Sequence, residues 1–180
     1  MPFTINGTTG INLGTQPLTG SLPDANAPSG SVIQVVSTTK TDVFSTTSLS
    51  LVDVTGVSVA ITPASSSNRI LINVQIYTGN TQLGDSNYFA LFRDSTQIGG
   101  GIPSSNRPSM FSSLLSSDSS GGYYAGGQFL DSPSTTSAIT YKIQMRVSSG
   151  TGRVGATGND IDTANRPRYA TTITVMEIAA

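Results

Sequence analysis

The sequence predicts an all-β protein: an antiparallel β-sandwich or jelly roll with an extended N-terminal arm. Composition is the first reason, since Ser and Thr number 51 of the 180 residues while only 11% of residues are charged. Residues that favour helices are therefore scarce. The second reason is a succession of short apolar segments, separated by polar turns, from residue 31 onward. The third is that no amphipathic helical period occurs anywhere in the chain.

The arm is expected over residues 1–30. Pro17, Pro23 and Pro28 restrict the backbone there to extended geometry, and no hydrophobic period is long enough to bury a face. A terminus without fixed structure is one interpretation. Apolar residues are more frequent here than in ordinary disordered linkers, which favours an arm that becomes ordered on a partner such as a neighbouring subunit. The expected partner-binding residues are Phe3, Ile5, Ile11, Leu13, Leu18 and Leu22.

The sandwich domain is expected over residues 31–180. Its clearest strand is 69–77, where the even-numbered apolar residues share a core face and Leu71 and Tyr77 lie on the opposite face. A second clear alternation, 138–147, places its odd-numbered residues in the core. Further strands are expected at 31–36, 49–54, 57–61, 88–92, 110–115, 123–130 and 169–178, with Gly56 as a break. Shorter extended pieces of two residues are expected at 43–44, 97–98 and 153–154.

This pattern of about eight to ten short strands favours a sandwich over other all-β folds. An up-and-down barrel is less favoured because the loops are very uneven in length. A β-helix or propeller is less favoured because no fixed-length repeat occurs. Residues 99–122 and 148–168 are expected to be long loops, and the Gly pair at Gly126 is expected to mark a bulge or a close backbone approach.

The missing residue types exclude several function classes. The chain contains no His and no Cys, which excludes Ser-His-Asp and Cys-His catalysis, zinc sites built from these residues, and disulfides. The formal net charge is −1 without a basic cluster, so nucleic acid is not expected as the main partner. No apolar run is long enough for membrane insertion, and the first residues lack the pattern of a secretory signal. We expect no cofactor.

Without His and Cys, the remaining candidates for catalysis are carboxylates, Lys, Tyr and unassisted Ser. Most of the carboxylates stand in turn-like sequences where Asp caps backbone amides. Glycoside cleavage would require two of them, one held protonated in an apolar pocket. Turn chemistry is therefore the favoured interpretation of the set: Asp42, Asp53, Asp85, Asp94, Asp118, Asp131, Asp160, Asp162 and Glu177.

Three other patterns are weak. Asp160 and Asp162 could offer oxygens to calcium, but the spacing of a calcium-binding loop is missing. The run 99–101 of three Gly lacks the Lys and Ser or Thr of a phosphate loop. Four Tyr residues could stack on sugars, although packing within the core or between subunits is the favoured interpretation. These four are Tyr77, Tyr88, Tyr123 and Tyr124.

Several segments resemble a β-rich domain in structural proteins of tailed phages, frequent in marine phages and cyanophages and often labelled tail fibre. The segments are 31–47, 51–56, 90–95, 129–133 and 172–180, and the resemblance covers about residues 31–180. It implies a non-enzymatic virion protein that forms a homo-oligomer, often a trimer. The family pattern has no catalytic residues to transfer.

Two virion roles remain open. A tail fibre or fibre-tip protein that binds a host surface receptor is what the usual label indicates, but the chain has neither a heptad nor a shaft repeat. A capsid decoration (cement) protein requires only a compact trimeric head and arms that cross capsid subunits. We therefore expect a trimeric decoration protein on the surface of the virion, with the major capsid protein as its partner.

Overall fold

The computed structural model describes residues 27–180, and every strand pair within them is antiparallel. The predicted all-β antiparallel sandwich is thereby confirmed. Most of the predicted arm, with its six apolar residues, lies outside the described residues. Because nothing tests the boundary at residue 30, it stays a prediction.

The thirteen strands are β1 (Val32–Lys40), β2 (Phe44–Thr46), β3 (Val52–Ile61), β4 (Arg69–Gln75), β5 (Tyr77–Asn80), β6 (Ser86–Arg93), β7 (Thr96–Ile98), β8 (Ser112–Leu115), β9 (Tyr123–Tyr124), β10 (Gly127–Asp131), β11 (Ile139–Val147), β12 (Gly152–Val154) and β13 (Thr171–Ile178).

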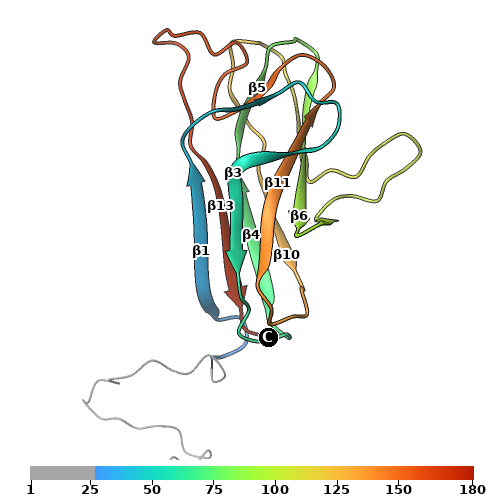
Figure 1. Ribbon diagram of the computed structural model, residues 1–180, viewed down its shortest axis with the longest axis vertical. Coiled ribbons are helices and arrows are strands. Elements are labelled where there is room, and N and C mark those ends of the chain that lie inside the picture. Colours follow the sequence, from blue (N-terminus) through green and yellow to red (C-terminus); the bar gives the residue numbers. More distant parts are fainter. Residues whose placement is uncertain (1–26) are drawn as a thin grey trace, which may run out of the picture.

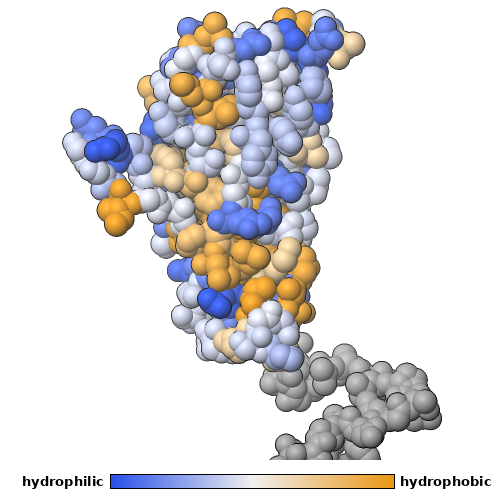
Figure 2. Space-filling view, turned by 180° about the vertical axis from the view of Figure 1, so that it is seen from behind, coloured by the Kyte–Doolittle hydropathy of each residue, from blue (hydrophilic) through white to orange (hydrophobic). Residues whose placement is uncertain are grey.

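Two main sheets face each other along an elongated body, which Figure 1 and Figure 2 show from opposite sides. Sheet I has the order β1-β13-β4-β10. Sheet II has the order β3-β11-β6-β7, with β8 also paired to β6. Sheet III, β2-β12-β5-β9, closes the end of the sandwich opposite to the C-terminus (Figure 1). No helix that could span a membrane occurs in residues 27–180.

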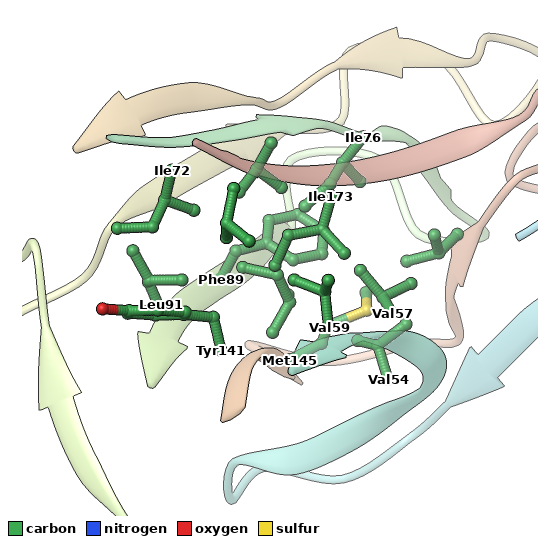
Figure 3. Close-up of a cluster of buried hydrophobic side chains, with 14 of the residues drawn as sticks. Val54, Val57, Val59, Ile72, Ile76, Phe89, Leu91, Tyr141, Met145 and Ile173 are labelled. Atoms are coloured by element: carbon green, nitrogen blue, oxygen red, sulfur yellow. The ribbon is translucent and has the colours of Figure 1, made fainter. Parts of the chain in front are cut away.

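The core lies between sheets I and II (Figure 3). Both predicted alternations are confirmed, because Ile70, Ile72 and Val74 of β4 are fully buried and so are the inward residues of β11 from Tyr141 to Val147. Side chains of β3 and β6 complete the interdigitated layer, among them Val57, Phe89 and Leu91. Each fully buried aliphatic or aromatic side chain contributes about 1.5–3 kcal/mol relative to exposure.

Gly56 does not end a strand, and the prediction of a break there was wrong. β3 continues through it with a positive φ of 83°, and its register against β11 shifts between Lys142 and Gln144. A glycine reaches this conformation without steric cost, and a bulge in a strand often requires it. A glycine within an apolar segment can therefore mark a bulge as well as a strand end. The long side chain of Lys40 lies over the space that a Cβ of Gly56 would enter.

The other differences concern short pieces of strand. The predicted strand 69–77 is divided into β4 and β5, and 123–130 is divided into β9 and β10 on either side of Gly126. The close backbone approach expected at this glycine is confirmed, since the Val74 carbonyl oxygen occupies the place of a Cβ. Thirteen strands replace the expected eight to ten because these divisions and sheet III add very short elements.

Substitution of Gly79 by alanine is expected to destabilise sheet III by about 1–3 kcal/mol, the usual cost of forcing atoms into a packed region. Gly79 lies in β5, and a Cβ there would collide with the backbone nitrogen of Gly158 and the carbonyl oxygen of Gly121. Thermal unfolding of Gly79→Ala measures the effect. The control is Gly101→Ala, where a Cβ meets no atom within 4 Å. Equal melting temperatures for both variants would contradict the close packing of this sheet.

Candidate interaction surface

The outer face of sheet I has an apolar lower half and a polar upper half. Leu71 on β4 lies between Met176 and Leu130 in the register, and Val35 pairs with Met176, so one apolar row crosses all four strands. Just below this row, Ile178 lies between Val32 and the exposed Arg69, which is a cation at the border of the apolar group. Figure 2 shows apolar side chains gathered on the lower half of the face. We call the six residues the apolar half-face: Val32, Val35, Leu71, Leu130, Met176 and Ile178.

The exposure of this surface is considerable. Val35 is 56% exposed, Val32 53% and Leu130 41%, while the other three are half-buried. A single exposed apolar residue is ordinary on a protein surface. A contiguous group on one sheet face is typical of a surface that binds another molecule.

The upper half of the same face differs in chemistry. The next row consists of Ser37, Thr174, Asn73 and Gln128. Its hydroxyl groups bond to each other, with 2.8 Å between Ser37 Oγ and Thr174 Oγ1. One further row up, the hydroxyls of Thr39 and Thr172 lie 3.3 Å apart. The sheet is therefore suited to water above and to an apolar partner below.

Behind the apolar half-face, the inner side of sheet I carries two buried acids. Gln34, Glu177, Ile70 and Asp131 form one register row that points into the sandwich. Glu177 is 0% exposed. Its carboxylate accepts hydrogen bonds from Gln34 Nε2 at 2.6 Å, Asn68 Nδ2 at 2.7 Å and the Ala64 backbone N–H at 2.8 Å. Burial raises the pKa of Glu177, but these donors outweigh burial and hold its pKa below the ordinary value.

Asp131 joins the two main sheets. Its carboxylate accepts two bonds from Arg93 Nη1 of β6, at 3.0 and 2.8 Å, and one from the Tyr141 hydroxyl of β11 at 2.7 Å. Burial, together with the adjacent carboxylate, raises the pKa of Tyr141 far above its ordinary value, so the phenol stays protonated and remains a donor.

These acids fix the orientation of the apolar half-face. Side chains alternate across a strand, so a register slip of one residue in β13 would turn Glu177 to the surface and Met176 into the core. The slip would also separate the Glu177 carboxylate from its three donors. The outward position of the apolar row is therefore determined by the polar residues behind it.

The described chain begins at the same end of the sandwich. Ala27 lines a hollow of about 440 Å³, and the backbone N–H of Gly30 donates to the Ala179 carbonyl at 2.9 Å. A turn closes when the Ser31 N–H donates to the Pro28 carbonyl at 3.0 Å, with Gly30 at a positive φ of 87°. The six predicted partner-binding residues precede this point and lie outside the described residues: Phe3, Ile5, Ile11, Leu13, Leu18 and Leu22.

The other carboxylates are distributed over the molecule. Asp118 accepts the N–H of Ser120 two residues on, as turn chemistry predicts. Asp94 stands in the turn between β6 and β7 at a positive φ of 52°, but it accepts the N–H of Thr140 from the neighbouring strand β11. Asp53, Asp131 and Glu177 instead lie on strands, where turn chemistry was the wrong interpretation. Within residues 27–180, no group of three or more acidic residues could hold a metal ion.

The proposed calcium ligands Asp160 and Asp162 lie beside two arginine side chains. Asp160 pairs with Arg168, with 2.9 Å between Oδ1 and Nε. Arg166 and Arg168 line the same hollow as both carboxylates. Two guanidinium groups repel a cation from this place, and Asp160 is better explained as the partner of Arg168.

The tyrosines pack largely on one another. Tyr77 lies on the outer side of its strand, as predicted, and is 37% exposed. It stacks on Tyr169 with 4.8 Å between ring centroids and meets Tyr124 edge-on at 5.8 Å. The guanidinium of Arg146 lies 4.2 Å above the ring of Tyr88. These contacts fit the packing interpretation of the aromatic residues.

Sequence reasoning singled out only Leu71 from the apolar half-face. Met176 and Ile178 alternate within one predicted strand, which marks them as facing one side together. Val32 and Val35 are three residues apart, and they share a face only because of the register irregularity between Val32 and Gln34. The assembly of the six residues into one surface depends on which strands are neighbours, and that information comes from the register alone.

No protein-family model matches this sequence. No curated protein matches it either. Among solved structures, the chain is similar to a mutant VP2 protein of infectious bursal disease virus in derived T=1 particles. The match covers 100% of this chain and 44% of that chain, with 13% identity and a TM-score of 0.45. For the structure of the Gt strain of the same virus, the match covers 98% and 47%, with 14% identity and a TM-score of 0.46. The chain thus spans less than half the length of these proteins.

Proposed function

We propose that this chain is a non-enzymatic structural protein of a phage virion and that it acts as a capsid decoration (cement) protein. The apolar half-face carries the proposal, because it offers a contiguous apolar surface whose natural use is contact with another protein. The resemblance of residues 31–180 to a phage structural domain supports a structural role in the virion, although its usual label is tail fibre. The chain then works on the surface of the particle, with the major capsid protein as its partner.

The mechanism is mechanical rather than chemical. Apolar surface that is removed from water stabilises a contact by roughly 25 cal/mol per Å². Bridging of neighbouring capsid subunits by the sandwich and the arm stabilises the shell without any reactive group. Several copies that are joined in one oligomer, a trimer in this proposal, hold by effective concentration even where each single contact is modest.

A second role is favoured by one specific observation. The loop between β7 and β8 projects from the body (Figure 1), and Ile102 within it is 96% exposed. A projecting loop with an apolar residue is a suitable receptor contact for a tail fibre or fibre tip. This alternative places the protein on the tail and the loop against a host surface molecule.

Deletion of residues 2–28 is expected to remove the protein from phage heads, since the deletion takes away the arm that crosses capsid subunits. Immunogold labelling of intact virions first locates the wild-type protein, and gel densitometry of purified particles then measures occupancy of the variant. Gold on heads together with lost occupancy supports decoration. Gold on tails, or full occupancy with failed adsorption to host cells, contradicts decoration and favours the fibre role.

A further inference from the structure

Strand β1 presents an open edge. It pairs with β13 on one side, and no backbone hydrogen bond joins its other side to any part of residues 27–180. The strand is nine residues long. Positions 32–39 contain neither proline nor a charged side chain. A long uncharged edge of this kind is a template for pairing with another extended chain.

The usual protection of an edge is weak at β1. Lys40 is the only charged residue of the strand, but it is just 6% exposed and its Nζ binds Asp42 at 2.8 Å. The register irregularity of β1 lies at its first residues, between Val32 and Gln34. The edge strand of sheet II differs, since β3 carries a bulge at Gly56 in its middle and an exposed ion pair.

The apolar half-face extends to this same edge. Its two most exposed residues, Val32 and Val35, both belong to β1. A further strand beside β1 would cover them and would place its own apolar side chains next to the row that starts at Val35. The edge therefore fits an uncharged extended segment with alternating apolar residues.

The N-terminal segment of this chain has that chemistry. Among residues 1–26, Asp24 is the only charged side chain. Apolar and polar residues alternate over 3–6 and again over 11–13, so each piece can direct two apolar side chains to one face of a strand. Because an extended chain spans about 3.3 Å per residue, a segment of this length reaches a neighbouring copy.

The place of Ala27 points to a second copy rather than to the same chain. If the turn at Pro28 folded the segment back along its own β1, Ala27 would lie beside Val32. Ala27 instead shares a hollow with Asn68 and the C-terminal Ala180, across the end of the sandwich. The described chain therefore begins away from its own β1 edge, which favours a second copy as the partner.

We propose that residues 3–13 of one copy add as a strand to the free edge of β1 of a second copy and extend its apolar half-face. The partner is thus another molecule of this chain, held by backbone hydrogen bonds at the edge and by apolar contacts beside Val35. The proposal rests on the assembly role described above and identifies the surface that receives the arm.

Site-specific crosslinking tests this directly, because the full-length chain contains no cysteine. Chains with Thr4→Cys are mixed with differently tagged chains that carry Ser37→Cys, next to the apolar row on β1, and are treated with a short bismaleimide. The expected product contains one chain of each tag. The matched control replaces Ser37→Cys by Ser58→Cys, an exposed serine on the outer face of sheet II. Equal crosslinking of Ser58→Cys overturns the proposal.

Two further crosslinking experiments complete the test. The double variant Thr4→Cys/Ser37→Cys is expected to crosslink between chains, and a product that forms only within single chains contradicts the proposal. Val35→Lys in the Ser37→Cys chain is expected to reduce the mixed product about tenfold, because it places a charge against the apolar side chains of the added strand. Thr39→Lys puts the same charge on the same strand but among the polar rows, and is expected to leave most of the product. Circular dichroism verifies that both lysine variants are folded. If crosslinking persists while virions lack the protein, the proposed function fails and this inference stands.

Discussion

Replacement of Glu177 by alanine is expected to lower the free energy of unfolding by about 3 kcal/mol or more, because it leaves several buried donors without a partner. The Gln34 amide, the Asn68 amide and the Ala64 N–H all point at this carboxylate, which is fully buried. Chemical denaturation at neutral pH measures the change. A loss below about 1 kcal/mol, the range of ordinary surface substitutions, would contradict the arrangement.

The same residue predicts an acid-dependent stability. The folded pKa of Glu177 is lowered, so its contribution is complete above the ordinary value of 4.5 and is lost as the pH falls through the lower folded pKa. Glu177→Gln keeps the shape of the side chain but cannot titrate. We expect the melting temperature of this variant to be lower at neutral pH and to fall less steeply in acid than that of the wild type. If the melting temperatures of the two proteins fall equally as the pH is lowered, this account of Glu177 is contradicted.

Replacement of Asp131 by alanine is expected to cost about 3 kcal/mol, since it leaves the Tyr141 hydroxyl buried without an acceptor and Arg93 without its ion partner. This value is at the lower end for buried pairs because the Arg93 side chain is 26% exposed. The milder variant Tyr141→Phe removes one hydrogen bond and is expected to cost about 1–1.5 kcal/mol.

A double-mutant cycle gives the control for this cluster. In the Asp131→Ala background, Tyr141→Phe is expected to cost much less than in the wild type, because the hydroxyl has already lost its acceptor. Equilibrium unfolding of the four proteins supplies the coupling energy. Additive effects would mean that Asp131 does not bind Tyr141 across the two sheets.

The fold class and the core faces of the long strands could be predicted because alternation is a local property. Ile70, Ile72 and Val74 reveal their common face in any window that contains them. Glycine accompanies both bulges and strand ends. The sequence therefore could not show that β3 continues through Gly56, or that the strand predicted over 123–130 is divided at Gly126. Sheet III has strands of two to four residues, too short for a periodic signal.

The candidate surface could be predicted only in part. Leu71 stands out as an apolar residue on the polar side of its strand. Val35, Met176 and Leu130 are distant in sequence, and only the antiparallel register places them beside it. Asp131 and Glu177 look like other acids in the sequence, because a buried carboxylate is identified by its donors and these come from other strands.

The occupancy of purified virions by two aspartate variants of β4 tests the central claim most directly. Leu71→Asp places a charge in the apolar half-face, whereas Asn73→Asp places it two residues further along the same strand and on the same outer face, in the polar row. Both variants should fold, which thermal unfolding verifies. The account predicts a loss of about tenfold or more in occupancy for Leu71→Asp and little change for Asn73→Asp. Wild-type occupancy for both would contradict it.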